Sequence, residues 1–564
     1  MIRARKPYGL RLLFGIALIW ALFLPVASER GFTLDARPPI ALLIALGLIA
    51  VCALAGRGLW TAVRWLLAIT LIVLAGLQVV NATVDRMLDR PLDLYFDLRH
   101  VPSLLGLYLG AAGWRGMVVI AGVVVALLFG IWLLASSLKA IERAATRPFF
   151  AIASLCVAVI GLVVAAMPID AVNGRAIAVT AHQASESWRS FAVLHGINHE
   201  YDAALQVPQK PFGPLPGLDG HDVYLVFIES YGTVGLDDPA YHATLAPALA
   251  DFATTVEGSG YHLVSNRLVS PTYGGGSWLA HGTMSSGVKL DSLLNELVLN
   301  SDRKSLPRYL KAAGYRAIEV MPGIKKPAPE AAFWGFDKDY DAATLGYAGP
   351  EFGWFDVPDQ YTLSQVSARE LTPGHAPLFA QIVLVSSHTP FAPVPPYLDD
   401  WNDATEFKSV PMADWPRIYA PPDWNNLDKP YLDSVAYDLK TLGAWLSHLD
   451  NNALVIILGD HQPPEITRGA NQAWTVPVYA LSREASLIRP FEAEGYVAGD
   501  DPPATDHPIG MEKFLGMFLD AYGPCMPSPD AAAVVTRPAC ATPNASARAA
   551  APPQSPDAPP VSQP

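Results

Sequence analysis

Residues 453–464 read ALVIILGDHQPP, an unbroken apolar run that ends in Gly459, Asp460 and His461. A continuous run of leucine and β-branched residues predicts a strand buried on both faces, as in a parallel sheet that is covered by helices. In such sheets ligands bind outside the carboxyl ends of the strands, which is where Asp460 and His461 would stand. The segment therefore predicts a fold class and one part of a functional site.

Further apolar runs of strand length alternate with helix-length segments between residues 221 and 523. This alternation predicts an α/β domain with a mostly parallel sheet covered by helices on both faces. The range is long enough to bury a full core. The predicted strands are Val223–Ile228, Arg316–Met321, Leu378–Ser386, Ala453–Leu458 and Val476–Leu481, and the predicted helices include Arg303–Ala313 and Tyr431–Leu449.

Two more of these strands end in polar side chains. The first strand runs into Glu229 in FIESYG, and the third runs into His388 in SSHTPF. Singly, a glutamate in this place is usually solvated or caps a helix, and a lone histidine is usually structural. Because the carboxyl ends of parallel strands share one edge, three strands that deliver such groups together favour a functional site.

A glycine-rich segment, SPTYGGGSWLAHGT, lies between these strands at residues 270–283. The three glycines permit positive φ and close backbone approach, and Ser277 would open a helix whose N–H groups face an anion. Beside a divalent cation, such a hydroxyl can act as a nucleophile. The alternatives are a flexible turn with Ser277 as a plain N-cap, or Thr272 or Thr283 as the nucleophile, although neither directly follows the glycines.

Five apolar runs precede the α/β region, at about 9–27, 38–56, 66–82, 117–136 and 149–168, each close to the roughly 20 residues that a membrane span needs. They predict a five-helix transmembrane domain over 1–168, followed by a connector over 169–220 with a helix near 176–195. Nine Lys and Arg residues fall on one side of these spans and six on the other. The excess places the N-terminus inside the cytoplasm and the α/β domain outside.

Composition and charge support this division. Of the 564 residues, 51% are hydrophobic and 16% are charged, against about 25% charged in a typical soluble protein. Residues 1–169 carry a net charge of +8 and the remainder carries −21, which argues against nucleic acid as a partner. Residues 524–564 are rich in Pro and Ala, and we expect them to be largely disordered. Cys525 and Cys540 could form a disulfide outside the cytoplasm, which the sequence leaves open.

The order of these motifs resembles the alkaline phosphatase superfamily. Glu229 after the first strand, a Gly-rich segment with a hydroxyl, and then strand-Gly-Asp-His are most similar to the sulfatase-domain membrane enzymes of the lipoteichoic acid synthase and phosphoglycerol transferase type. The resemblance implies one divalent ion, manganese first and magnesium or zinc as alternatives, held by Glu229, Ser277, Asp460 and His461. It also implies that Ser277 is the nucleophile, where those enzymes have Thr, and that His388 binds the phosphoryl group.

Two aromatic segments resemble the substrate-side region of the same enzymes. They are Phe333–Asp337, which reads FWGFD, and Gly353–Asp356, which reads GWFD, so Trp334 and Trp354 are candidate substrate-binding residues. The arginine that grips phosphate in the family is not evident near FWGFD. Lys325 or Lys326 is the candidate replacement.

The resemblance implies a transferase in the bacterial cytoplasmic (inner) membrane with a periplasmic or extracytoplasmic catalytic domain. It would move a phosphoglycerol-type headgroup from a phospholipid to a glycan or glycolipid acceptor through a covalent serine intermediate. Alternatives are a phosphoethanolamine transferase or a phosphodiester or sulfate-ester hydrolase of the same superfamily, and a non-catalytic membrane sensor or scaffold. The chain lacks the Cys/Ser-x-Pro-x-Arg motif of true sulfatases, and it has IESYG where phosphoethanolamine transferases have GETAR.

Overall fold

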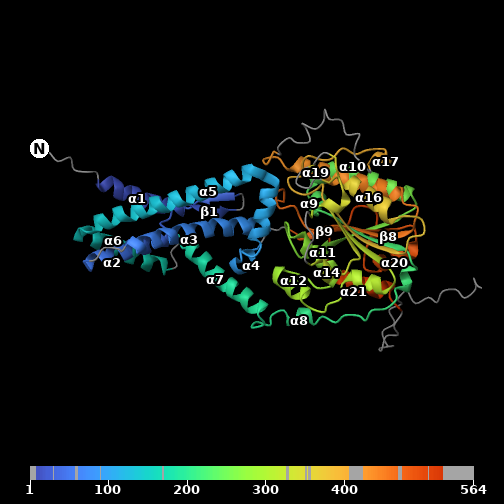
Figure 1. The fold of residues 1–564 in the computed structure, drawn as a ribbon, viewed down its shortest axis with the longest axis horizontal. Coiled ribbons are helices and arrows are strands. Elements are labelled where there is room, and N and C mark those ends of the chain that lie inside the picture. The colour runs from blue at the N-terminus through green and yellow to red at the C-terminus, as the bar shows by residue number, and fades with distance from the viewer. Residues whose placement is uncertain are drawn as a thin grey trace, which may run out of the picture.

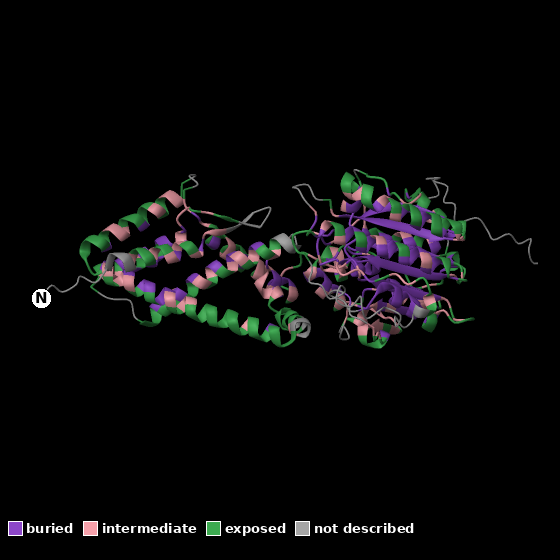
Figure 2. Cartoon of the chain, turned by 90° about the horizontal axis from the view of Figure 1, so that it is seen from above, coloured by how far each residue is buried: buried purple, intermediate pink, exposed green. Residues whose placement is uncertain are grey.

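The structure is a computed structural model that describes residues 8–28, 31–56, 61–88, 90–167, 171–324, 330–349, 352, 357–404, 423–467, 473–505 and 507–524. These residues form an N-terminal bundle of helices with an α/β domain at one end of it (Figure 1). Buried residues are concentrated in the sheet of the α/β domain, whereas the outer surface of the bundle is largely exposed (Figure 2). Apart from Pro524, the predicted tail, including both of its cysteines, lies outside the described residues.

The bundle contains a helix for each of the five predicted apolar runs. Three segments, Thr61–Asp85, Gly113–Ala145 and Pro148–Ala165, are long and apolar enough to cross a membrane, and they indicate a membrane protein. The other two apolar helices are shorter, so among the described residues three of the five expected spans reach spanning length. The helices are α1 (Tyr8–Leu22), α2 (Ile40–Leu54), α3 (Thr61–Leu88), α5 (Val101–Ala145) and α6 (Pro148–Ala165), with a hairpin of β1 (Pro25–Ser28) and β2 (Gly31–Leu34) after α1.

Helix α5 is broken at Gly113, whose φ of 56° and ψ of −140° are not helical. Residues after Gly113 run along the bundle, whereas residues 101–112 turn across the end of the bundle that faces the α/β domain (Figure 1). The short α4 (Leu94–Asp97) precedes this crosswise segment. The connector contains α7 (Arg175–Leu194), close to the predicted helix at 176–195, and α8 (Asp202–Leu205).

The sheet of the α/β domain has the strand order β10-β4-β9-β8-β3-β7-β5-β6, with β11 beside β4. Strands β8, β3, β7, β5 and β6 are parallel, and β9 is antiparallel to both of its neighbours. The prediction of a mostly parallel sheet is therefore confirmed. The strands are β3 (Asp222–Ile228), β4 (His262–Val269), β5 (Arg316–Met321), β6 (Lys338–Asp341), β7 (Leu378–Leu384), β8 (Ala453–Gly459), β9 (Thr475–Ser482), β10 (Val497–Ala498) and β11 (Ile509–Gly510).

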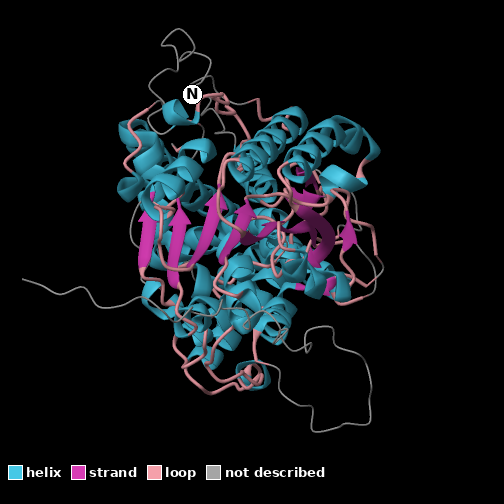
Figure 3. Cartoon of the chain, turned by 90° about the vertical axis from the view of Figure 1, so that its right-hand side faces the viewer, coloured by secondary structure: helices cyan, strands magenta, loops and turns pink. Residues whose placement is uncertain are grey.

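Helices cover both faces of the sheet (Figure 3). Alternate residues of β3 pack into two separate cores, Tyr224, Val226 and Ile228 into one and Val223, Leu225 and Phe227 into the other. Burial on both sides explains why these strands are continuously apolar. The first core includes α10 (Pro239–Gly258), α16 (Asp359–Glu370) and α19 (Asp428–Ser447), and the second includes α11 (Ser277–Ser286), α13 (Leu306–Ala312), α20 (Ala485–Ala493) and α21 (Phe514–Tyr522).

Smaller helices complete the α/β domain. They are α9 (Val234–Asp237), α12 (Ser292–Leu299), α14 (Ala331–Trp334), α15 (Ala342–Leu345) and α17 (Trp401–Ala404), together with the 3-10 turns η1 (Pro216–Leu218) and η3 (Met511–Lys513).

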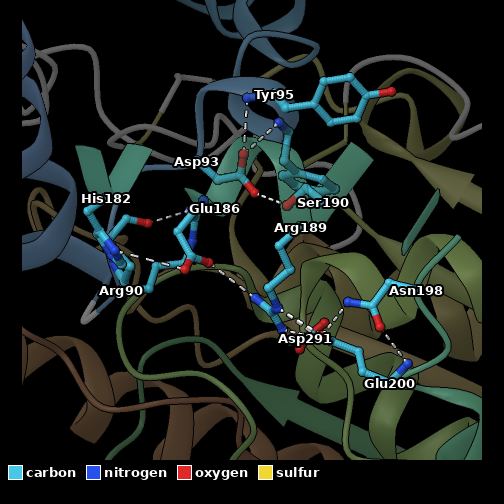
Figure 4. Close-up of polar contacts among 12 residues, drawn as sticks. Arg90, Asp93, Tyr95, His182, Glu186, Arg189, Ser190, Asn198, Glu200 and Asp291 are labelled. Atoms are coloured by element: carbon cyan, nitrogen blue, oxygen red, sulfur yellow. Dashed lines mark hydrogen bonds and ion pairs between the residues drawn. The ribbon is translucent and has the colours of Figure 1, made fainter. Parts of the chain in front are cut away.

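Polar contacts join the bundle, the connector and the α/β domain (Figure 4). Asp93 caps α4 and accepts a hydrogen bond from Ser190 on α7. Arg189 of α7 donates to the hydroxyl of Tyr201 at 3.1 Å, and that hydroxyl donates to Asp291, the N-cap of α12. A small apolar cluster lies beside these contacts and contains Phe96, Val193 and Leu293.

Candidate metal centre and active site

Glu229, Asp460 and His461 come together at the carboxyl ends of β3 and β8, which are neighbouring parallel strands. One ligand atom from each residue lies within 4.8 Å of the other two, and all three residues are buried. Nε2 of His461 is 3.2 Å from Oε1 of Glu229 and 3.8 Å from Oδ1 of Asp460. The three residues therefore form a possible metal-binding triad at one edge of the sheet.

Ser277 is the first residue of α11, and its hydroxyl points into this triad. Its Oγ lies 3.0 Å and 3.2 Å from the two carboxylate oxygens of Glu229, and 3.3 Å from Nε2 of His461. The preceding residues Gly274, Gly275 and Gly276 have φ values of 134°, 75° and 70°. Residues with a Cβ rarely adopt this region, so the three glycines are what allow the loop to deliver Ser277 here.

The ring of His461 is held by backbone groups on both sides. Nδ1 lies 2.9 Å from the carbonyl oxygen of Gln462, which makes Nδ1 the protonated nitrogen. In the neutral ring, the form that binds a metal, Nε2 then carries the lone pair and accepts the N–H of Gly275 at 3.0 Å. A second hydrogen bond that fixes the tautomer is the usual support of a metal-ligating histidine.

Asp460 provides the test of whether a cation fits this site. Its Oδ1 accepts the backbone N–H groups of Ser230 and His461, both at 2.7 Å. Its Oδ2 is buried and, among the described residues, has no hydrogen-bond partner. A buried carboxylate oxygen without a partner is unfavourable, and a bound cation would satisfy it. Oxygen and nitrogen ligands without a thiolate suit Mn²⁺, Mg²⁺ or Zn²⁺, so the residues present fit a divalent ion.

The electrostatics of the triad agree with this assignment. Burial and the neighbouring Glu229 raise the pKa of Asp460 to about 7. Burial lowers the pKa of His461, but Asp460 and Glu229 outweigh this effect and raise it to about 10. Burial would raise the pKa of Glu229, but contact with His461 holds it well below its usual range. Two carboxylates in one buried site thus need a positive charge, which a divalent ion supplies more fully than a protonated imidazole.

His388 follows β7, which flanks β3 on the side opposite β8. The preceding residue, Ser387, donates its hydroxyl to the carbonyl oxygen of Glu229 at 2.7 Å. His388 also contributes to the low pKa of Glu229. Three adjacent strands, β8, β3 and β7, therefore deliver the strand-end residues that the sequence singled out.

The two threonines considered as alternative nucleophiles make backbone hydrogen bonds instead. Thr272 Oγ1 donates to the carbonyl oxygen of Gly275 at 2.7 Å, and Thr283 Oγ1 accepts the N–H of Leu290 at 3.0 Å. Thr272 thereby supports the glycine loop, and Thr283 holds the segment that follows α11.

The two tryptophans proposed to bind substrate are placed differently. Trp334 packs in a small cluster behind α11, where a Cβ on Gly282 would stand 3.0 Å from its ring. Trp354, like Lys325 and Lys326, lies outside the described residues. Trp278, which directly follows Ser277, has an exposed fraction of 43% and places an aromatic surface next to the nucleophile candidate.

His281 is a residue of this region to which the sequence analysis assigned no role. It lies one helical turn after Ser277, its ring is centred 4.2 Å from that of Phe227, and its buried Nε2 has no hydrogen-bond partner among the described residues. Burial lowers the pKa of His281 to about 4, so the ring is neutral near pH 7. The i, i+4 spacing from Ser277 is the signal that could have identified it.

Residues 283–475 match the Sulfatase family. The matched range lies within the α/β domain. The matched range contains Asp460, His461 and His388, and the fold adds Glu229 and Ser277, which precede it. No curated protein matches the chain significantly.

Several solved structures resemble the chain at low identity. They include the lipoteichoic acid synthase LtaP from Listeria monocytogenes (16% identity, 54% of this chain and 72% of that chain, TM-score 0.35). The phosphoglycerol transferase GacH from Streptococcus pyogenes is 12% identical over 61% of this chain and 88% of that chain, with a TM-score of 0.35. The lipooligosaccharide phosphoethanolamine transferase A from Neisseria meningitidis is 13% identical over 91% and 94%, with a TM-score of 0.42. At these values the likeness does not extend to activity or substrate.

Proposed function

We propose that this protein is a membrane-anchored, metal-dependent transferase that moves a phosphoglycerol-type headgroup from a phospholipid to an extracytoplasmic glycan or glycolipid. The observation that carries the proposal is the position of Ser277 Oγ, 3.0 Å from a carboxylate oxygen of Glu229 and 3.3 Å from Nε2 of His461. A hydroxyl that opens a helix among metal-binding side chains is placed to attack an electrophilic phosphorus.

The position of the site supports a lipid donor. Helices α9 and α11, which follow β3 and carry Ser277 respectively, lie on the side of the sheet that faces the helical bundle (Figure 1). Three segments of that bundle are long and apolar enough to cross a membrane. This placement supports the phosphodiester of a phospholipid headgroup as the donor.

In the first half of the reaction, Ser277 Oγ would attack the phosphorus and form a phosphoserine diester. The bond from phosphorus to the lipid oxygen breaks, and diacylglycerol leaves with the proton that Ser277 gives up. Glu229, Asp460, His461 and the Ser277 oxygen would hold the divalent ion, which when bound lowers the pKa of the hydroxyl and offsets charge on the phosphoryl oxygens. The backbone N–H groups of Ser277 and Trp278, at the start of α11, would donate to the same oxygens.

In the second half, an acceptor hydroxyl attacks the phosphorus and the bond to Ser277 breaks. The proton of the acceptor hydroxyl returns to Ser277, so the cycle consumes and releases no net proton. His388, at the end of β7, would donate a hydrogen bond to a non-bridging oxygen in both halves. Two steps allow diacylglycerol to leave before the acceptor enters.

Manganese is the proposed ion, and the bacterial cytoplasmic membrane with an extracytoplasmic α/β domain is the proposed location. The oxygen and nitrogen ligand set supports Mn²⁺, Mg²⁺ or Zn²⁺. The excess of Lys and Arg on the N-terminal side of the bundle supports the orientation. A phosphatase reporter fused after residue 524 should be active in cells, and a cytoplasmic reporter that is active at that position instead would contradict the orientation.

The test of function uses the purified full-length protein in vesicles of phosphatidylglycerol or of phosphatidylethanolamine, with and without Mn²⁺. We expect metal-dependent release of diacylglycerol from phosphatidylglycerol that Ser277→Ala abolishes. Release from phosphatidylethanolamine alone would replace the proposal with a phosphoethanolamine transferase. Free glycerol phosphate formed at the same rate with and without an acceptor would indicate a hydrolase. No turnover of either lipid, with no bound metal, would indicate a sensor or scaffold.

A further inference from the structure

An apolar helical segment lies between α4 and the kink in α5, and most of its described side chains are exposed. Residues 101–112 read VPSLLGLYLGAA and contain no charged side chain. An apolar stretch of this length is typical of either a buried core helix or a segment at a membrane surface. Val101, Leu104, Leu105 and Tyr108 have exposed fractions of 46%, 61%, 43% and 38%, which excludes a buried core helix.

The geometry of the segment matches a membrane surface. At Gly113 the chain turns from this segment into a helix that is long and apolar enough to span a membrane. The segment itself runs across the end of the bundle rather than along it (Figure 1). Trp114, at the turn, has an exposed fraction of 68%. Tryptophan at the boundary between a span and water is typical of the interfacial aromatic belt.

The flanks of the segment are basic. Arg99 lies over the ring of Tyr95, with 4.6 Å from its guanidinium carbon to the ring centroid, and Arg115 lies 6.0 Å from the ring of Trp114. Both arginines are exposed, and residues 98–116 contain no Asp or Glu. Nη2 of Arg99 donates to the hydroxyl of Tyr95 at 2.8 Å, and the other N–H groups of its guanidinium match phosphate oxygens.

We propose that residues 101–112 lie embedded in the bilayer surface next to the α/β domain, and that Arg99 and Arg115 bind the phosphate groups of anionic lipids there. The apolar side chains replace contact with water by contact with acyl chains. Each arginine near an anionic surface contributes to lipid binding. The inference rests on this segment and its flanks and does not depend on the chemistry of Ser277.

Spin-label accessibility tests the embedding. The four native cysteines are replaced, a nitroxide is attached at Leu105→Cys in the full-length protein, and the protein is placed in phosphatidylglycerol nanodiscs. We expect the label to be more accessible to oxygen than to a water-soluble nickel complex. A label at Val497→Cys, whose exposed fraction of 42% on β10 matches the 43% of Leu105, should show the reverse order. Equal behaviour of the two labels, or shielding of Leu105→Cys from both reagents in a dimer, would overturn the embedding.

Lipid retention tests the arginines. The wild type and the Arg99→Gln and Arg115→Gln variants are purified from mixed phosphatidylglycerol and phosphatidylcholine micelles, and bound lipid is measured by mass spectrometry. We expect each substitution to weaken retention of phosphatidylglycerol by about fivefold and to leave phosphatidylcholine unchanged. Arg489→Gln, an exposed arginine on α20, is the control. Unchanged phosphatidylglycerol retention in the Arg99→Gln, Arg115→Gln double variant would contradict the assignment.

Discussion

A Cβ atom on Gly459 would stand 1.8 Å from the carbonyl oxygen of Tyr231, so the end of β8 and the loop after β3 touch backbone to backbone. The reverse contact is also close, because a Cβ on Gly232 would stand 1.9 Å from the side-chain Oε1 of Gln462 and 2.8 Å from its backbone Cα. The two loops that carry the triad therefore pack closely against each other, and each has a glycine at the point of contact. This contact sets the distance between Glu229 and Asp460.

Gly459→Ala should separate these two loops. Because backbone blocks the added methyl group, we expect the variant to lose about 3 kcal/mol of folding free energy or more, measured as a lower thermal midpoint in detergent. Gly516→Ala on α21, where a Cβ meets nothing within 4 Å, is the matched control and should leave the midpoint unchanged or slightly higher. Equal midpoints for the two variants would show that the loops can shift without cost.

Removal of either carboxylate of the triad should remove the metal, because each carries a charge that the ion balances. Asp460→Asn takes away the charge on a buried oxygen that lacks a protein partner, and Glu229→Gln removes the charge nearest Ser277. Elemental analysis should find one divalent ion per chain in the wild type and in Asp251→Asn, an exposed position on α10, and almost none in the two site variants. Two tightly bound ions in the wild type would contradict a single-metal site.

Thr283→Ala tests whether the hydroxyl of Thr283 has a structural role or takes part in the reaction. The substitution leaves the N–H of Leu290 without its acceptor, so we expect a loss of about 1–2 kcal/mol in stability. Lipid turnover should stay within a few-fold of the wild type, since the Thr283 hydroxyl serves the backbone. A loss of turnover as large as that of Ser277→Ala would place Thr283 in the reaction.

Glu319 on β5 should make stability depend on pH. Burial and the nearby Asp339 raise its pKa to about 8, although Gln381 donates a hydrogen bond to it at 2.9 Å. The unfolded chain releases this proton near pH 4.3, whereas the folded chain keeps it to about 8. The contribution of Glu319 to the free energy of unfolding is therefore fully present below about pH 4.3, and it is lost as the pH rises to about 8.

The measurement is the thermal midpoint of the wild type and of Glu319→Gln between pH 5 and pH 9. The glutamine variant should fall less steeply as the pH rises, so its midpoint relative to the wild type increases with pH. Glu492→Gln, an exposed site on α20, should follow the wild-type curve. Parallel curves for Glu319→Gln and the wild type would show that Glu319 is ionised in the fold throughout this range.

The central strands could be predicted because each is buried on both faces and therefore reads as an apolar run. Predicted strand 453–458 is β8, which ends one residue later, and predicted strand 316–321 is β5. Strand β4 could not be found in this way. Its middle residues Ser265, Asn266 and Arg267 are buried but polar, and Arg267 is compensated by Asp237 and a carbonyl oxygen far away in the sequence. The antiparallel direction of β9 also depends on neighbours that composition does not reveal.

The residues of the possible metal-binding triad could be singled out in the sequence because strand ends carry them. Glu229, Asp460 and His461 share an edge because their strands are adjacent, a relationship that follows from the parallel-sheet prediction. The absence of a partner for Nε2 of His281 among the described residues, and the packing of Trp334 behind α11, depend on how the helices pack, which the sequence pattern does not specify. The domain boundaries that the sequence predicts, after residues 168, 220 and 523, remain predictions.

The central claim is that Ser277 forms a covalent phospho-intermediate. The most direct test is intact-mass and peptide mass spectrometry of the full-length enzyme quenched in acid during turnover of phosphatidylglycerol without acceptor. We predict a phosphoglycerol adduct on the peptide that contains Ser277, absent from Ser277→Ala although that variant still binds one metal ion. An adduct on Thr272 or Thr283, or near-normal turnover by Ser277→Ala, would contradict the account.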